Sequence, residues 1–195
     1  MKNIVHIGLP KTATSLFQDS LFRQTKTCRY VGPYNYSDNH TLVKKVFTNQ
    51  KLTVNEIKSL KNFFHVNIPT LFSDEAIGNG TNVHRIEKYN RIIEFLGDVR
   101  WVITLRHPID ILESLYLWDV QSLKRTNRHY LEFKRWFNYR WASYIKGNLN
   151  CNISCVDGGR ILKELVEHVG HDNVDIFIYE DFIFRKEDFV SRMSS

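Results

Sequence analysis

The sequence predicts an α/β fold, a three-layer sandwich whose central layer is a mostly parallel β-sheet. Short apolar runs alternate with helical patterns along the chain, which is typical of β-α-β units. The apolar runs show little polar alternation, as expected for strands that helices cover on both faces. Polar clusters directly follow three of the runs, and ligands of parallel sheets bind beyond the carboxyl ends of the strands. The sequence therefore predicts a ligand site at that edge.

The composition agrees with one globular domain over residues 1–195. Hydrophobic residues make up 43% of the chain and charged residues 25%, which are ordinary values for a soluble protein. No Pro- or Gly-rich linker divides the chain. The formal net charge of +6 favours anionic ligands. This charge does not by itself indicate nucleic acid, and no nucleic-acid partner is expected.

The three cysteines, Cys28, Cys151 and Cys155, form neither a disulfide framework nor a zinc-binding spacing. Reduced thiols are typical of the cytoplasm, so a cytoplasmic location is expected. The apolar run at the N-terminus is too short for a signal peptide. No run approaches the roughly 18 apolar residues of a membrane span, so no span is expected.

A capping box fixes one helix in the first half of the chain. Thr53 and Glu56 stand three residues apart at the start of an amphipathic run, which predicts a helix to about residue 64. The other elements follow from apolar runs and turn residues. They are a strand at 4–7, a helix at 15–25, a strand at 28–32, a loop at 33–41 and a strand at 67–72.

Gly97 and Pro108 delimit the elements of the second half. Gly97 ends a helix predicted at 85–96, and Pro108 fits the first turn of a helix predicted at 108–121. A helix at 129–146 carries an aromatic stripe expected in the core, namely Tyr130, Phe133, Phe137, Trp141 and Tyr144. The remaining elements are strands at 100–105, 151–156 and 174–179 and a helix at 159–169 that ends at Gly170.

A lysine among small hydroxyl residues follows the first predicted strand. This strand–loop–helix is P-loop-like, because backbone N–H groups converge on an anion at the helix start. Lys11 can place its charge on a phosphate or on the group being transferred. No Gly directly precedes Lys11, so the stretch departs from the Walker A pattern G-x-x-x-x-G-K-[ST]. The candidate binding residues are Pro10, Lys11, Thr12, Ala13, Thr14 and Ser15.

A second candidate phosphate site follows the strand at 100–105. Arg106 leaves the strand end, and Ser114 lies about two turns into the next predicted helix. A guanidinium fork and a hydroxyl can together hold a second phosphate. The alternative is an ion pair between Arg106 and a nearby carboxylate. Convergence of this cluster with the Lys11 loop and with residues 73–75 favours the phosphate site.

These stretches together resemble the PAPS-dependent sulfotransferase family. PAPS is 3′-phosphoadenosine 5′-phosphosulfate. Residues 8–15 are similar to the family's 5′-phosphosulfate loop, P-K-[TS]-G-[TS]-[TS], with Ala13 in place of the usual Gly at a position where a negative φ is expected. Residues 105–116 resemble its 3′-phosphate motif, R-x-P-x-[DE] followed by Ser, and residues 177–182 resemble its late strand ending in Y-E-D.

The resemblance implies transfer of a sulfuryl group from PAPS to a hydroxyl or amine of a carbohydrate or small-molecule acceptor, which leaves PAP. It implies that Lys11 stabilises the leaving phosphate, that the loop holds the 5′-phosphate, and that Arg106 and Ser114 hold the 3′-phosphate. No metal is expected. Family members usually continue beyond the last strand with a further helix and loop, so the chain is expected to be short at its carboxyl end.

An acceptor hydroxyl needs a general base within hydrogen-bond reach. Glu75 is the first choice, because it closes a predicted strand beside the Lys11 loop. Asp74 and Asp38 are the alternatives. His6 lies inside the first strand and is expected to be a core or supporting residue, and His107 is expected to cap the next helix.

Two other functions stay open. A P-loop kinase or NTPase would need Mg²⁺ and an Asp that closes a strand, Asp74 or Asp181, but would leave Arg106 and Ser114 unexplained. The second alternative function is a nucleotide-binding protein without transfer activity. Basic residues at 124–140 are expected to form a solvated helix face, with a surface for an anionic glycan as the alternative; they are Lys124, Arg125, Arg128, Lys134, Arg135 and Arg140.

Overall fold

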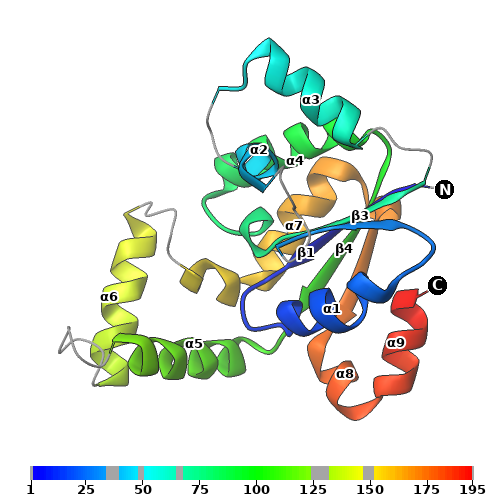
Figure 1. Cartoon of the computed structure of the whole chain (residues 1–195). Helices are drawn as coiled ribbons and strands as arrows, with labels where there is room; N and C mark the ends of the chain where they lie inside the picture. Colours follow the sequence, from blue (N-terminus) through cyan, green and yellow to red (C-terminus); the bar gives the residue numbers. More distant parts are fainter. Residues whose placement is uncertain are drawn as a thin grey trace.

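The computed structural model describes residues 2–33, 40–47, 51–64, 68–123, 132–146 and 152–194. The strands form one five-stranded sheet in the order β2-β3-β1-β4-β5, and every pair of neighbours is parallel. Helices flank this sheet (Figure 1), which confirms the predicted α/β sandwich. The strands are β1 (Asn3–Gly8), β2 (Arg29–Val31), β3 (Thr70–Ser73), β4 (Val99–Leu105) and β5 (Val174–Ile178).

The first face of the sheet carries the larger core. Val5 and Ile7 of β1 are buried in it together with Trp101 and Ile103 of β4. Four helices bury their apolar stripes against these side chains. They are α2 (His40–Phe47), α3 (Val54–Phe64), α4 (Asn82–Leu96) and α7 (Gly158–Val169).

The opposite face of the sheet carries a smaller aromatic core. The ring centroid of Phe17 lies 5.2 Å from that of Phe182 and 5.4 Å from that of Phe189, and Phe177 of β5 joins this cluster. Because the central strands face a core on both sides, their side chains are apolar with little alternation. The helices of this face lie together in Figure 1; they are α1 (Thr14–Ser20), α8 (Tyr179–Phe184) and α9 (Lys186–Ser194).

Two helices, α5 (Pro108–Leu123) and α6 (Phe133–Ile145), project from the sheet as an arm (Figure 1). The buried carboxylate of Asp119 on α5 accepts hydrogen bonds from Trp136 Nε1 at 2.6 Å and from Arg140 Nε at 2.9 Å. These bonds fix the rotation of α6 on α5.

The predicted core stripe of α6 is wrong in part. Phe133 is 45% exposed and Trp141 is 39% exposed, whereas Trp136, which is not in the stripe, is only 1% exposed. The hydrogen bond from Trp136 to Asp119 turns the helix away from the expected face, so a tertiary contact overrides the local pattern. Tyr130 lies outside the described residues.

The basic face predicted at 124–140 is partly engaged within the protein. Arg140 binds Asp119, and Arg135 pairs with Glu132 at 2.8 Å. Lys134 is exposed, as expected of a solvated helix face. Three further members lie outside the described residues, namely Lys124, Arg125 and Arg128.

Of the remaining secondary-structure predictions, the capping box is confirmed and one strand is wrong. The capping box is confirmed, because the Thr53 N–H donates to Glu56 Oε2 at 2.8 Å and the Glu56 N–H donates to Thr53 Oγ1 at 3.3 Å. The strand predicted at 151–156 is wrong: a 3₁₀ helix, η5 (Asn152–Val156), packs against the helices there and buries Cys155. Helices α2, α8 and α9 were not expected. The described residues also form the 3₁₀ helices η1 (Phe22–Gln24), η3 (Glu75–Ile77) and η6 (His171–Asn173).

Elements elsewhere end close to their predicted limits. The first helix stops earlier than expected, at Ser20, and the last strand stops at Ile178, where α8 begins. Within the part of the chain that the structure describes, no helix has both the length and the apolar character that a membrane span requires.

Candidate active site

Three polar segments meet at the carboxyl edge of the sheet, as predicted. They follow β1, β3 and β4, which are neighbours in the sheet. Arg106 Nη1 donates a hydrogen bond to the carbonyl oxygen of Lys11 at 2.8 Å, which joins the loop after β1 to the turn after β4. Burial and the charge of Asp74 raise the pKa of Glu75, and the charge of Lys11 opposes this rise, so the segment after β3 lies within electrostatic reach of the same lysine.

The loop between β1 and α1 is held by hydroxyl groups. Thr12 Oγ1 and Thr14 Oγ1 both donate to the carbonyl oxygen of Leu9, at 2.6 and 3.2 Å, and both threonines are buried. They therefore shape the loop from within, whereas Ser15 is exposed at the start of α1. Gly8 permits this packing, because a Cβ there would lie 2.1 Å from Thr14 Cγ2.

The conformation expected for Ala13 is wrong. Its φ is 60°, and that of Lys11 is 68°, so both residues adopt the left-handed conformation that favours glycine. A negative φ was expected from the sequence for Ala13, which stands at the position where the family has Gly. The loop instead keeps the glycine-type turn with an alanine, whose methyl group packs on the smaller core.

We expect Ala13→Gly to leave the free energy of unfolding unchanged within about 1 kcal/mol. Glycine relieves a strain of about 1–2 kcal/mol but loses about 0.8 kcal/mol of methyl burial and about 0.5–1 kcal/mol of chain entropy. Ala13→Val adds a branched side chain at positive φ and should cost about 1–3 kcal/mol. Urea denaturation measures both variants, and a valine variant as stable as the parent would contradict the left-handed conformation.

Arg106 has the features of an anion-binding group. Its guanidinium lies 4.6 Å from the ring centroid of Tyr179, and its Nε is buried without a hydrogen-bond partner. Among the described residues, no carboxylate lies within ion-pair distance of Arg106. The predicted alternative of a simple ion pair is therefore not observed in the described part of the chain.

The turn that carries Arg106 is fixed from two sides. The His107 N–H donates to Glu180 Oε1 at 2.9 Å, and the His107 carbonyl accepts from the N–H of Ile111 in the first turn of α5. Tyr179 and Glu180 of the predicted Y-E-D stretch thus both contact this turn, Tyr179 through the Arg106 guanidinium and Glu180 through the His107 N–H. Ser114 lies half-buried on α5.

Glu75 lies in η3, directly after β3. Burial and the charge of neighbouring Asp74 raise the pKa of Glu75 to about 7, against the opposing charge of Lys11. A carboxyl group with this pKa can accept a proton near neutral pH. Asp74 Oδ1 instead caps η3 by accepting from the Ala76 N–H at 2.7 Å, and Asp38 lies outside the described residues.

His6 is a buried core residue beneath the site. Its Nδ1 lies 2.8 Å from Ser73 Oγ, and its Nε2 lies 3.0 Å from Thr104 Oγ1. Burial lowers the pKa of His6 to about 3, so the ring is neutral at ordinary pH. His6 therefore bridges β3 and β4 just before the segments that carry Glu75 and Arg106.

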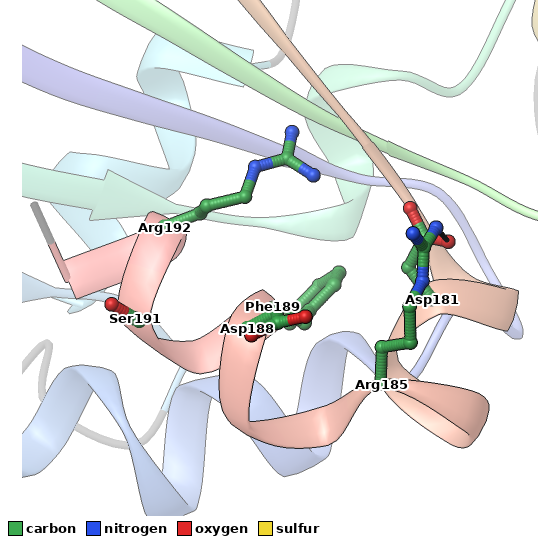
Figure 2. Close-up of a pocket in the computed structure, with 6 residues that line it drawn as sticks. All are labelled: Asp181, Arg185, Asp188, Phe189, Ser191 and Arg192. Atoms are coloured by element: carbon green, nitrogen blue, oxygen red, sulfur yellow. Dashed lines mark hydrogen bonds and ion pairs between the residues drawn. The ribbon is translucent and has the colours of Figure 1, made fainter.

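A cavity of about 290 Å³ lies between α8 and α9 (Figure 2). None of its lining residues belongs to the candidate site predicted from the sequence. They are Asp181, Arg185, Asp188, Phe189, Ser191 and Arg192. Asp181, one of the two strand-closing acids considered for a kinase or NTPase, forms an ion pair with Arg185 there. The described residues contain no group of three or more His, Cys, Asp or Glu that could hold a metal ion.

The sequence reasoning missed Trp118. Lys11 Nζ lies 5.0 Å from the centroid of its ring, in a cation–π contact, and the indole is 49% exposed. Trp118 follows Ser114 by four residues, so both lie on one face of α5. This four-residue spacing was the signal in the sequence that could have placed Trp118 beside the candidate site.

Comparisons with known proteins support the fold. No protein-family model matches the sequence, and no curated protein matches it significantly. The structure is similar to a sulfotransferase from Alicyclobacillus acidocaldarius, with a TM-score of 0.68 and 16% identity over 99% of this chain and 79% of that chain. A gluconokinase from Sinorhizobium meliloti 1021 gives a TM-score of 0.42 and 11% identity over 99% of this chain and 93% of that chain. The likeness to the first protein shows a shared α/β fold.

Proposed function

We propose that this protein is a PAPS-dependent sulfotransferase. The observation that carries the proposal is that two cationic groups, Lys11 and Arg106, follow adjacent strands and that the Arg106 guanidinium binds the main chain of the Lys11 loop. A nucleotide with phosphates on both its 3′ and 5′ positions needs two such groups, whereas a nucleoside triphosphate carries its phosphates in one chain. The similarity in fold to a sulfotransferase supports the same conclusion.

The chain's own residues fit the anionic ends of this nucleotide. Lys11 and the free N–H groups at the start of α1 would hold the 5′ end. Arg106 and Ser114 would hold the 3′-phosphate. The buried Nε of Arg106 supports this assignment, because a buried donor without a partner is costly unless a ligand oxygen accepts from it.

PAPS supplies an activated sulfuryl group for transfer to a hydroxyl or amine of a carbohydrate or small molecule. Glu75 would accept the proton of the acceptor as its oxygen or nitrogen bonds to sulfur. The Lys11 ammonium would neutralise the charge that develops on the departing phosphate oxygen. A single domain and a cytoplasmic location remain predictions from the sequence.

Calorimetric titration without metal tests the nucleotide assignment. PAP and 5′-AMP differ only in the 3′-phosphate, so the proposal predicts that Arg106→Ala weakens PAP binding by about 10–100-fold, the value of a charge-assisted hydrogen bond. Binding of 5′-AMP should change less than about threefold, which also checks that the loop is intact. The control is Arg135→Ala, which removes an exposed guanidinium.

Equal losses for PAP and 5′-AMP would contradict the 3′-phosphate site. A preference of the parent protein for ATP with Mg²⁺ would favour the kinase alternative. PAP binding without any turnover of PAPS would favour a nucleotide-binding protein that does not transfer.

A further inference from the structure

Helix α4 places two cations inside the protein, next to the candidate site. Arg85 is 0% exposed and Lys88 is 9% exposed, and the two lie three residues apart on one face of the helix. Charged side chains are almost never buried to this extent without partners. Neither residue has a role in the proposed chemistry.

Both cations bind the backbone of one short segment. Lys88 Nζ donates to the carbonyl oxygens of Ala76 and Asn79, each at 2.6 Å, and Arg85 Nη1 donates to the carbonyl oxygen of Gly80. These three carbonyls belong to the five residues that follow Glu75. The segment 75–80 is therefore tied to α4 through its main chain.

The two cations differ in how their charges are balanced. Glu164 of α7 pairs with Arg85 and accepts from its Nε at 2.8 Å. Lys88 has no carboxylate within ion-pair distance among the described residues, and the charge of Asp74 acts on it from further away. Burial and the charge of Arg85 lower the pKa of Lys88 to about 8, so it is mostly protonated at neutral pH.

The same segment packs against the Lys11 loop on its other side. A Cβ on Gly78 would lie 2.6 Å from Leu9 Cδ2, so the two segments are in close contact. The Leu9 carbonyl is the oxygen that holds both loop threonines. Segment 75–80 is thus clamped between α4 and the loop that carries Lys11.

We propose that Lys88 is a positioning residue, which holds segment 75–80 by its main chain and so keeps Glu75 half-buried beside Lys11. This inference rests on the proposed role of Glu75 as the general base. Arg85, fixed by Glu164, supports the far end of the segment. Without Lys88 the carbonyls of Ala76 and Asn79 lose their donor, and Glu75 moves toward solvent.

The direction of change in the pKa of Glu75 separates positioning from simple electrostatics. If Lys88 positions the segment, Lys88→Met exposes Glu75 to water, and its pKa falls from about 7 toward 4.5. If Lys88 acted only through its charge, removal of that charge would raise the pKa of Glu75. The two outcomes have opposite signs.

The experiment is a carboxyl ¹³C NMR titration of the full chain, with the Glu75 signal assigned by its loss in Glu75→Gln. Lys58→Met is the control, because Lys58 is exposed on α3. Lys88→Arg keeps a cationic donor and should restore a pKa near that of the parent. A pKa of Glu75 that stays the same or rises in folded Lys88→Met overturns the proposal.

Two additions keep the test decisive. Should Lys88→Met fail to fold, Lys88→Gln is the second variant. Its side chain is shorter and uncharged, so it binds the two carbonyls less well than Lys88 and should still lower the pKa of Glu75, and an unchanged value would overturn the inference. In a transfer assay Lys88→Met should lower kcat and move the acid limb of the pH profile, with the KM for PAPS changed less than about threefold. The NMR result holds whether or not the protein turns over PAPS, so failure of the proposed function is seen separately.

Discussion

Lys11→Ala is expected to slow sulfuryl transfer by about 10²–10³-fold, the usual effect of removing one group that stabilises developing charge. The ammonium lies beside Trp118 and within reach of Glu75, at the end of the central strand. Its cation–π contact is worth about 0.5–1 kcal/mol at an exposed site, so the fold should survive the substitution. Release of PAP from PAPS, with the best acceptor of a panel of sugars and phenols, measures the rate.

Lys163→Ala is the matched control for this variant, because Lys163 is an exposed lysine on α7. It should leave both rate and melting temperature unchanged. Near-parental turnover in Lys11→Ala would show that the charge on the leaving phosphate is stabilised by another group.

Glu75→Gln is expected to make stability depend steeply on pH between 4.5 and 6.5, where the parent protein should be almost insensitive. His6 and Glu75 act in opposite directions in this range. Burial lowers the pKa of His6 from 6.5 to about 3, so the unfolded chain binds more protons at this site and stability rises with pH. The pKa of Glu75 is raised from 4.5 to about 7, so the folded chain binds more protons there and stability falls as pH rises.

Each group contributes a slope of about 1.4 kcal/mol per pH unit within its window, and the two slopes cancel where the windows overlap. Removal of Glu75 leaves the His6 slope alone, so the free energy of unfolding should increase by about 2–3 kcal/mol from pH 4.5 to 6.5. Urea denaturation at several pH values measures this. His6→Asn in the Glu75→Gln background should flatten the profile again, and equal profiles for parent and Glu75→Gln would mean that the Glu75 carboxyl is not buried.

The main elements of the fold could be predicted because their signals are local. The apolar run of β1, the capping box at Thr53 and the stop at Gly97 each lie within a few residues of chain. The exposed stripe of α6 could not be predicted, since its rotation depends on a bond between Trp136 and Asp119 of another helix. The same holds for η5, whose apolar residues resemble a strand but pack against helices.

The candidate site also contains residues with a local signal in the sequence and residues whose contacts are purely tertiary. The convergence of Lys11, Glu75 and Arg106 could be predicted because each closely follows an apolar run, and parallel strands bring such positions together. Trp118 could have been noticed from its four-residue spacing to Ser114 on the predicted helix, but its contact with Lys11 is tertiary. The contacts of Lys88 with the main chain after β3 have no signal in the residues around Lys88.

The bridge made by His6 has a consequence for catalysis. Ser73 and Thr104, its two partners, lie two residues before Glu75 and Arg106, respectively. The imidazole stays uncharged over the whole range in which Glu75 gains and loses its proton. In the proposed mechanism Glu75 therefore gains and loses its proton while the charge of the imidazole beneath it stays the same, so the hydrogen bonds that join β3 and β4 through His6 are not disturbed by turnover.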